Sequence, residues 1–215
     1  MIGQGIYSLA DVARLTGLPS ATVRSWFKWR SDGAGKGPMF QSDYAVVENE
    51  TAVSFLDLID SYVAKYFRDR EVPPAIIRKA YLALQAKLNT RHPFAHASLC
   101  VGDGRIIMET SGELVDAIND VKWFPQMKDC LDKIEYEGPL AARWHIAKGI
   151  IVDPAFSFGQ PVIEDTSITT FVLANQFEAN QKDAALVSWL FQVKAADVMN
   201  AVVFEQSMIA HRRAA

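Results

Sequence analysis

The sequence contains few of the features that mark secreted or membrane-spanning proteins. Its two cysteines, Cys100 and Cys130, are too few for a disulfide framework and are typical of a reducing compartment. No apolar run approaches the roughly 20 residues that a membrane span needs. The first residues also lack a basic segment followed by a continuous apolar core. We therefore expect a cytoplasmic protein that does not enter a membrane.

Motifs for catalysis, cofactors and metals are equally scarce. None of the four histidines has a Ser or Cys partner in a recognisable catalytic motif. His92 and His96 have a spacing that ligates zinc on a helix, but Pro93 lies between them and no third ligand is near. The glycine-rich stretch 33–37 lacks the spacing of a nucleotide P-loop. We expect no enzyme activity, no cofactor and no metal.

The charge of the chain is unevenly distributed. The net charge is −3, which argues against a protein that coats nucleic acid indiscriminately. Between Arg14 and Lys36, however, there are five basic residues and one acid, Asp32. Because affinity for nucleic acid follows local charge, this segment is the candidate for contact with DNA.

Residues 7–30 have the pattern of two helices joined by a tight turn. Ser8 suits an N-cap, and Gly17 suits the left-handed residue that ends a helix. In the second helix Val23, Trp26 and Phe27 recur at helical spacing and would pack on the first. The residues left facing outward are Ser20, Ala21, Thr22, Arg24, Ser25 and Lys28. This pattern is typical of a recognition helix in a major groove, and also of an ordinary helical hairpin with a solvated basic face.

The same stretch resembles the N-terminal helix-turn-helix of the MerR family of transcription regulators. The match lies in Tyr7, Leu9, Val12-Ala13, Leu15–Leu18 and Thr22–Arg24 followed by Trp26. The resemblance implies that the step from Thr22 to Arg24 opens the recognition helix and that Trp26 locks the helix to its scaffold. Arg24 and the neighbouring hydroxyls would reach the DNA. The predicted DNA-binding residues are Ser20, Thr22, Arg24, Ser25, Lys28, Arg30 and Lys36, the last two as phosphate contacts in a wing of altered shape.

The segments after this stretch complete a first domain, residues 1–90. Residues 39–48 are predicted to be the extended return strand of the wing. Residues 51–70 and 75–88 are predicted to be helices, the first with an apolar stripe that leaves Asp57 and Asp60 outside it. Both helices are predicted to pack in the core and support the first motif, and their order again resembles the MerR scaffold.

The remainder divides into a connecting region, residues 91–148, and a C-terminal unit, residues 149–215. A β-hairpin is predicted from residues 94–101 and 105–110 around Gly102-Asp103-Gly104. Another strand is expected at 130–136. A short strand at 149–153 is followed by three predicted helices at 170–178, 182–191 and 195–209. The overall class is therefore α+β.

The C-terminal unit resembles a family of small bacterial domains known by its catalogue number, the four-hundred-and-thirty-third domain of unknown function. The match lies in Ile150–Pro154, Phe158–Ile163, Thr166–Ile168 and Lys194–Val198. The family's Gly-Thr-Arg step is Asp165-Thr166-Ser167 here, so no role of that arginine carries over. Proteins of this family often act as antitoxins beside a PIN-like ribonuclease toxin. Together with the MerR-like head, the chain resembles the longer VapB-type antitoxins.

These resemblances imply a dimeric antitoxin that represses its own operon by binding operator DNA and neutralises a PIN-like ribonuclease toxin. A helix-turn-helix protein that reads a palindrome needs two-fold symmetry, so we expect a homodimer formed by the C-terminal unit. From charge, Arg143, Arg212 and Arg213 are predicted to contact the toxin. The alternatives are a MerR-type regulator whose effector binds near Tyr62, Tyr66, Tyr81 or Trp123, and an adaptor without DNA binding.

Overall fold

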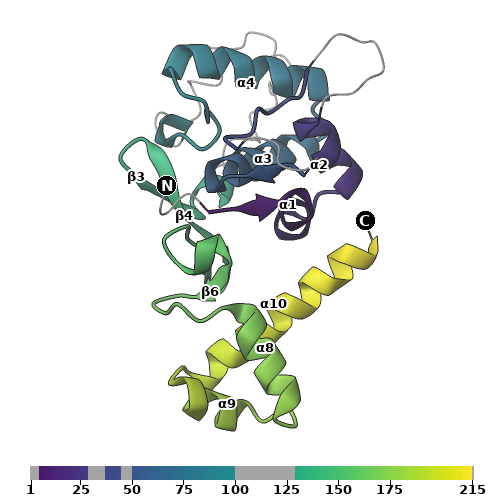
Figure 1. Cartoon of the computed structure of the whole chain (residues 1–215). Coiled ribbons are helices and arrows are strands. Elements are labelled where there is room, and N and C mark those ends of the chain that lie inside the picture. The colour runs from purple at the N-terminus through teal and green to yellow at the C-terminus, as the bar shows by residue number, and fades with distance from the viewer. Residues whose placement is uncertain (1–4, 29–36, 45–49, 100–128, 215) are drawn as a thin grey trace.

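The computed structural model describes residues 5–28, 37–44, 50–99 and 129–214, and from residue 210 onward it describes only the backbone. The protein belongs to the α+β class, as predicted. Figure 1 shows the N-terminal helices at one end, the C-terminal helices at the other, and a small sheet between them. The predicted hairpin turn at 102–104, Trp123, Arg30 and Lys36 lie outside the described residues.

The described residues of the N-terminal part form four α-helices and a two-stranded ladder. In order they are β1 (Tyr7–Ser8), α1 (Leu9–Thr16), α2 (Ser20–Phe27), β2 (Ala52–Val53), α3 (Phe55–Arg68) and α4 (Pro74–Leu88). β1 and β2 pair antiparallel. Ser8 and Asp11 form a capping box at the start of α1, which satisfies two backbone donors. Gly17 ends the helix with φ 73°, and its N–H bonds the carbonyl of Ala13, so the turn forms as the sequence predicted.

The described part of the segment after α2 is a packed coil, so the prediction of a return strand is wrong for residues 39–44. Phe40 is fully buried, and its N–H donates to the carbonyl of Trp26 over 3.0 Å. Its ring lies 5.5 Å from that of Trp26 and 4.8 Å from that of Tyr81. The backbone N–H and the ring of Phe40 therefore both contact the core, and this segment does not pair in a strand ladder.

α3 is the central helix of this part, and it departs from the predicted apolar stripe. Asp57 and Asp60, expected on its polar face, are 1% and 0% exposed. Leu58, Ile59 and Val63 are also buried, so the helix contacts protein on nearly every side. The partners of the two aspartates are described below.

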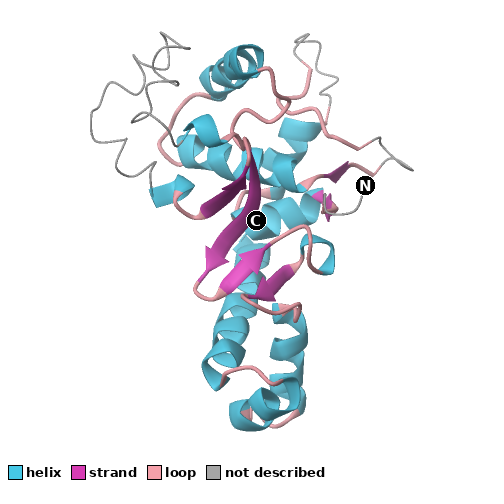
Figure 2. Ribbon diagram, turned by 90° about the vertical axis from the view of Figure 1, so that its left-hand side faces the viewer, coloured by secondary structure: helices cyan, strands magenta, loops and turns pink. Residues whose placement is uncertain are grey.

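Antiparallel strands form the middle of the molecule (Figure 2). The strands β3 (Ile134–Glu137), β4 (Leu140–Ala147), β5 (Ile150–Val152) and β6 (Pro161–Ile163) pair in chain order. The predicted boundary at 148/149 therefore falls in the turn between two paired strands, β4 and β5. Residues 94–99, predicted as part of a hairpin strand, form a turn and a 3-10 helix (Ala97–Leu99) with one bridge from His96 to Leu140, so that prediction is wrong.

Three helices occupy the ranges predicted for the C-terminal unit: α8 (Thr170–Ala179), α9 (Ala184–Phe191) and α10 (Ala195–Ala214). Thr169 caps α8 and Asp183 caps α9 through their side chains. Leu173, Val187 and Val198 are fully buried where the helices meet. We call α8, α9 and α10 the C-terminal helical unit.

Specific contacts join the two ends. The Tyr7 hydroxyl donates to the carbonyl of Gly159 over 2.9 Å, and the Tyr62 ring lies 4.5 Å from that of Trp144. α10 runs back from α9 to contact α1 (Figure 1), where Arg14 lies 3.9 Å from Glu205. These contacts tie β1, α1 and α3 to the C-terminal half.

Over the described residues, no single helix has the length and apolarity to cross a membrane. The consecutive pair Ala184–Phe191 and Ala195–Ile209 meets both criteria only when taken together, and it is bent by 109°.

Candidate functional site

The outward surface of α2 carries the predicted DNA-binding residues. Val23, Trp26 and Phe27 are buried against the rest of the N-terminal part, which fixes the rotation of the helix. Arg24 is exposed, as is Lys28 at the C-cap, whereas Ser20, Thr22 and Ser25 are half-buried. The structure thus brings these five residues together on one short helix.

Not all five are equally available for contact. The hydroxyl of Ser25 donates to the carbonyl of Thr22 over 2.7 Å. Ser20, Arg24 and Lys28 follow one another at intervals of four residues, so they line one edge of the helix. Pro19 is the N-cap of α2 and makes no side-chain hydrogen bond to the first turn.

The arginines predicted to contact a toxin lie in different settings. The guanidinium of Arg143 on β4 bonds Asp153 through Nε over 3.1 Å and Glu135 through Nη1 over 3.3 Å. It is therefore already engaged within its own sheet. Arg212 and Arg213 belong to the last turn of α10, where the structure describes the backbone alone.

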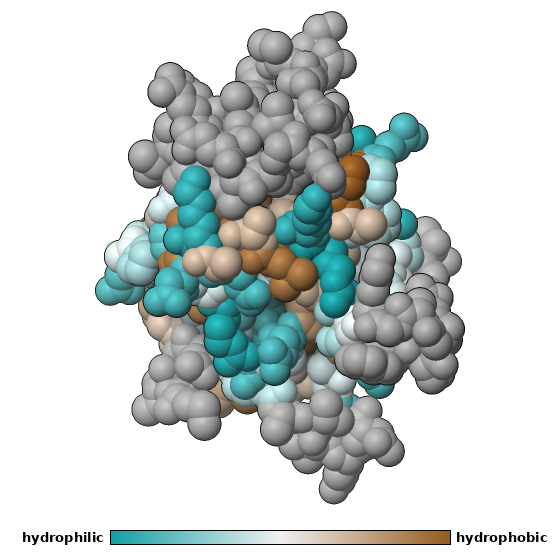
Figure 3. Space-filling view, turned by 90° about the horizontal axis from the view of Figure 1, so that it is seen from above, coloured by the Kyte–Doolittle hydropathy of each residue, from teal (hydrophilic) through white to brown (hydrophobic). Residues whose placement is uncertain are grey.

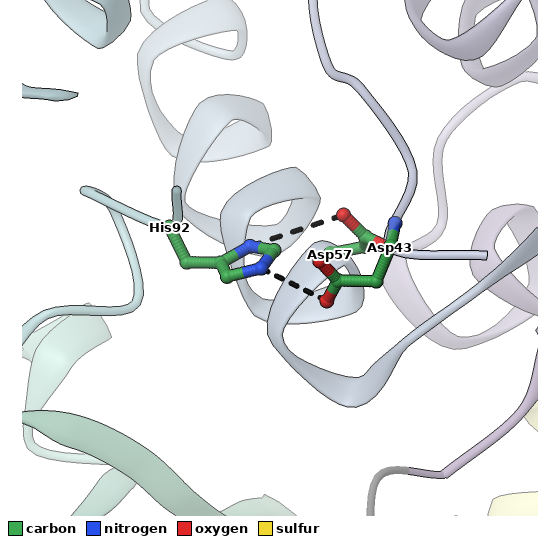
Figure 4. A group of neighbouring side chains, drawn as sticks. All are labelled: Asp43, Asp57 and His92. Carbon is green, nitrogen blue, oxygen red and sulfur yellow. Dashed lines mark hydrogen bonds and ion pairs between the residues drawn. The ribbon is translucent and has the colours of Figure 1, made fainter. Parts of the chain in front are cut away.

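A group of ionisable side chains that the sequence did not reveal is buried between α3, the segment before β2 and the loop after α4. We call three buried residues, Asp57, Asp60 and His92, together with the half-buried Asp43, the buried charge cluster. The His92 ring lies between carboxylates: Nε2 is 2.9 Å from Asp43 and Nδ1 is 2.9 Å from Asp60. Asp57 is 3.8 Å from Nδ1, and Figure 4 shows the ring facing the carboxylates of Asp43 and Asp57, with a dashed line from each ring nitrogen.

Asp60 is the most highly connected member of the cluster. One of its oxygens accepts the backbone N–H groups of Phe94 and Ala95, each over 3.0 Å. The other accepts the Tyr81 hydroxyl over 3.0 Å as well as bonding His92. A carboxylate that accepts several donors holds its surroundings in one arrangement, so Asp60 fixes the loop after α4 against α3.

Burial and charge act in opposite directions on these groups. Burial raises the pKa of Asp60 to about 6, although the hydrogen bond and charge of His92 pull that pKa down. Burial alone lowers the pKa of His92, but the hydrogen bond to Asp60 and the charges of Asp60, Asp57 and Asp43 raise it to about 9. His92 is therefore an imidazolium at neutral pH, with both ring N–H groups donating to carboxylates.

Asp43, Asp57 and His92 also offer donor atoms within 4.8 Å of one another, the arrangement closest to a metal site among the described residues. Both nitrogens of His92 already face carboxylates at hydrogen-bond distance, so a metal would have to displace a proton from this ring. We therefore interpret the cluster as an ion-pair network that holds the fold.

The sequence signal that could have found the cluster is the pair Asp57 and Asp60, three residues apart in a helix whose other residues are largely apolar. Their spacing matched a solvated face, and His92 lies more than thirty residues away in sequence. The predicted effector residues near this region are core instead. Tyr66 and Tyr81 are buried, and the Tyr62 ring packs on Trp144.

The described residues also line two clefts, one of which reaches the cluster at Asp43. One of about 540 Å³ lies between the start of α3 and the β3–β4 strands, and includes Asp43, Glu135, Glu137 and Asp153. The other, of about 620 Å³, lies between α1, α8 and α10, and includes Arg14, Phe171, Glu205 and Ile209. The second cleft is the more apolar of the two.

The C-terminal helical unit exposes large apolar side chains. Those exposed on α8, α9 and α10 are Phe171, Val172, Leu186, Trp189, Leu190, Met199, Val203 and Ile209. Trp189 is 70% exposed. By contrast, the end of the molecule that carries α4 shows hydrophilic side chains interspersed with small apolar areas (Figure 3).

Comparisons with known proteins give a likeness of fold. No family model matches the chain. It is 21% identical over 202 residues to Rv2308, an uncharacterized protein of Mycobacterium tuberculosis, covering 85% of this chain and 82% of that protein. It is also similar to the crystal structure of Rv2018 from Mycobacterium tuberculosis, with a TM-score of 0.68 and 19% identity, covering 91% of this chain and 96% of that chain. At these identities the chain shares a fold with the solved structure.

Proposed function

We propose that the chain is a dimeric, sequence-selective DNA-binding protein whose α1–α2 pair acts as a MerR-like helix-turn-helix. The observation that carries the proposal is the division of α2 into a buried apolar side and an outward edge with Ser20, Arg24 and Lys28. Short helices that present cations and hydroxyls in this way enter the major groove, where arginine bonds guanine and lysine bonds phosphate.

The experiment is fluorescence anisotropy of the purified protein on duplex DNA from upstream of its own gene, against a scrambled duplex, over a salt series. Arg24→Ala should weaken binding to the native duplex by about 1–3 kcal/mol and reduce the preference for it. Lys28→Ala should weaken binding to both duplexes alike. Arg68→Ala on α3 is the matched control and should bind normally. Equal affinity of wild type and Arg24→Ala would overturn the proposal.

We further propose that the protein is the antitoxin of a type II toxin–antitoxin system and neutralises a PIN-like ribonuclease. One support is the resemblance of the C-terminal unit to the four-hundred-and-thirty-third domain of unknown function. The other is the basic end of α10, because arginines bond the metal-binding carboxylates of such nucleases. Since Arg143 already pairs with Glu135 and Asp153, we expect Arg212 and Arg213 to contribute more to binding the nuclease.

Co-expression with a neighbouring nuclease gene tests this part. The double variant Arg212→Ala/Arg213→Ala should lose inhibition of the nuclease, whereas Arg143→Ala should lose less. Failure of the two chains to co-purify would contradict the antitoxin role and leave DNA binding standing.

A second candidate is a ligand-responsive regulator without a toxin. The observation that favours it is the cleft between α1, α8 and α10, because a ligand held there would touch both α1 and the C-terminal helical unit. Clefts of this size with an apolar lining and a few charged groups are typical of small-molecule sites. Its Arg14 and Glu205 would orient the ligand.

A further inference from the structure

The helix α9 is unusual because it has no charged residue and only one fully buried side chain, Val187. Leu186, Trp189 and Leu190 follow the spacing of one helix face, and they are 40%, 70% and 48% exposed. α10 packs on α9 and adds Met199 and Val203, one turn apart and also exposed. Apolar side chains gathered in this way on an exposed helix mark an interaction surface.

We propose that α9 is the centre of a two-fold interface with a second copy of this chain, in which the two α9 helices pack antiparallel. This deepens the proposed function, since it rests on the dimer that reading a palindrome requires. We call Leu186, Trp189, Leu190, Met199 and Val203 the α9 surface.

The area of the α9 surface fits such an interface. Each of its side chains exposes on the order of 100 Å². A stable interface buries about 800 Å² per partner, somewhat over half of it apolar. The α9 surface therefore supplies about the apolar area that one partner needs.

The charges that border α9 favour a copy of the same chain as the partner. Lys182 and Asp183 precede the helix, and Lys194 and Asp197 follow it, so each end carries both signs. In an antiparallel pair the start of one α9 lies beside the end of the other. Asp183 then meets Lys194 of the second copy, twice by symmetry. Antiparallel packing also places opposite ends of the two helix dipoles together.

The test is sedimentation velocity of the full chain without DNA, over a concentration series. Wild type should be a dimer, and Trp189→Glu should raise the dimer dissociation constant at least 100-fold, since it places two carboxylates at the centre of the interface. Leu82→Glu is the matched control, because Leu82 on α4 is 49% exposed, and it should remain a dimer. Lys194→Glu should weaken the dimer about 5-fold, through repulsion with Asp183. Thermal unfolding of each variant should match wild type at a concentration low enough to leave the wild type monomeric.

A wild type that stays monomeric at about 100 μM, or a Trp189→Glu variant that dimerises as wild type does, would overturn the interface. Wild type that binds phosphatidylcholine vesicles and does not dimerise would overturn it in favour of a lipid partner. The experiments distinguish failure of the proposed DNA binding from failure of the interface. A dimer that does not bind DNA contradicts the proposed function, and a monomer that binds DNA through Arg24 contradicts the interface.

Discussion

The two ends of the molecule satisfy their polar and apolar groups in opposite ways. The described residues of the N-terminal part bury most of their apolar side chains together with two aspartates, Asp57 and Asp60, and His92, and the only large apolar side chains exposed among them are Ile6 and Leu82. In the C-terminal helical unit the polar groups are satisfied locally by helix caps, whereas Phe171, Trp189 and Val203 are more than 60% exposed. The first part leaves little apolar surface exposed among its described residues, whereas the second exposes the apolar surface that we propose meets a second copy.

Among the substitutions that test this contrast, removing the central carboxylate of the buried charge cluster should cause the largest loss of stability. Asp60→Ala leaves His92 charged and the N–H groups of Phe94 and Ala95 without an acceptor, so it should lower the free energy of unfolding by about 3–5 kcal/mol. Urea unfolding followed by circular dichroism measures this.

The control for that variant lies on the same helix. Asp69 is exposed and pairs with Lys65 at the surface, so Asp69→Ala should cost under about 1 kcal/mol. Equal losses from the two variants would mean that the cluster does not hold the N-terminal part together.

The pH should act on the N-terminal part through His92. Its pKa in the folded protein is raised to about 9 from an ordinary 6.5, so its contribution to stability is complete below pH 6.5 and is lost as the pH rises toward 9. Between pH 6.5 and 8.5 the free energy of unfolding should fall by about 2–3 kcal/mol. His92→Gln should flatten this slope, as measured by urea unfolding over the same pH range.

How much of this could be predicted from sequence follows from the range of the interactions. Caps, the Gly17 turn and the three C-terminal helices depend on residues within four positions of one another, and their patterns predicted them. The burial of Asp57 and Asp60 depends on His92 and on the backbone of Phe94, far along the chain, so helical spacing placed these acids in solvent. The strand predicted around Phe40 was wrong for a similar reason, because an apolar residue between polar neighbours fits a strand as well as a packed coil. Helical spacing alone predicted which residues of α2 face outward. The ion pair of Arg143 could not be predicted in this way, because it depends on the strand register that places Arg143 opposite Glu135.

A substitution at Gly159 tests the contact between the two ends. This glycine has φ 82°, and a Cβ there would lie 2.0 Å from the Tyr7 hydroxyl oxygen. Gly159→Ala should therefore destabilise the protein by about 2 kcal/mol. In a Tyr7→Phe background, which removes that oxygen, the same substitution should cost less. Additive losses in this double-mutant cycle, measured by thermal unfolding, would contradict the contact.

The smallest expected effect concerns the cap of α9. The Asp183 side chain accepts the N–H groups of Ala185 and Leu186, each over 2.9 Å. Asp183→Ala should lower stability by about 1 kcal/mol, and Asp183→Asn should be nearly neutral because asparagine caps helices equally well. Unfolding at low concentration isolates this term from self-association. Sedimentation of Asp183→Asn then separates the two roles of the residue, since the cap persists while the charge that faces Lys194 of the second copy is gone. An Asp183→Ala variant that loses as much stability as Asp60→Ala would show that α9 is supported by more than its own cap, and the contrast between the two ends would fail.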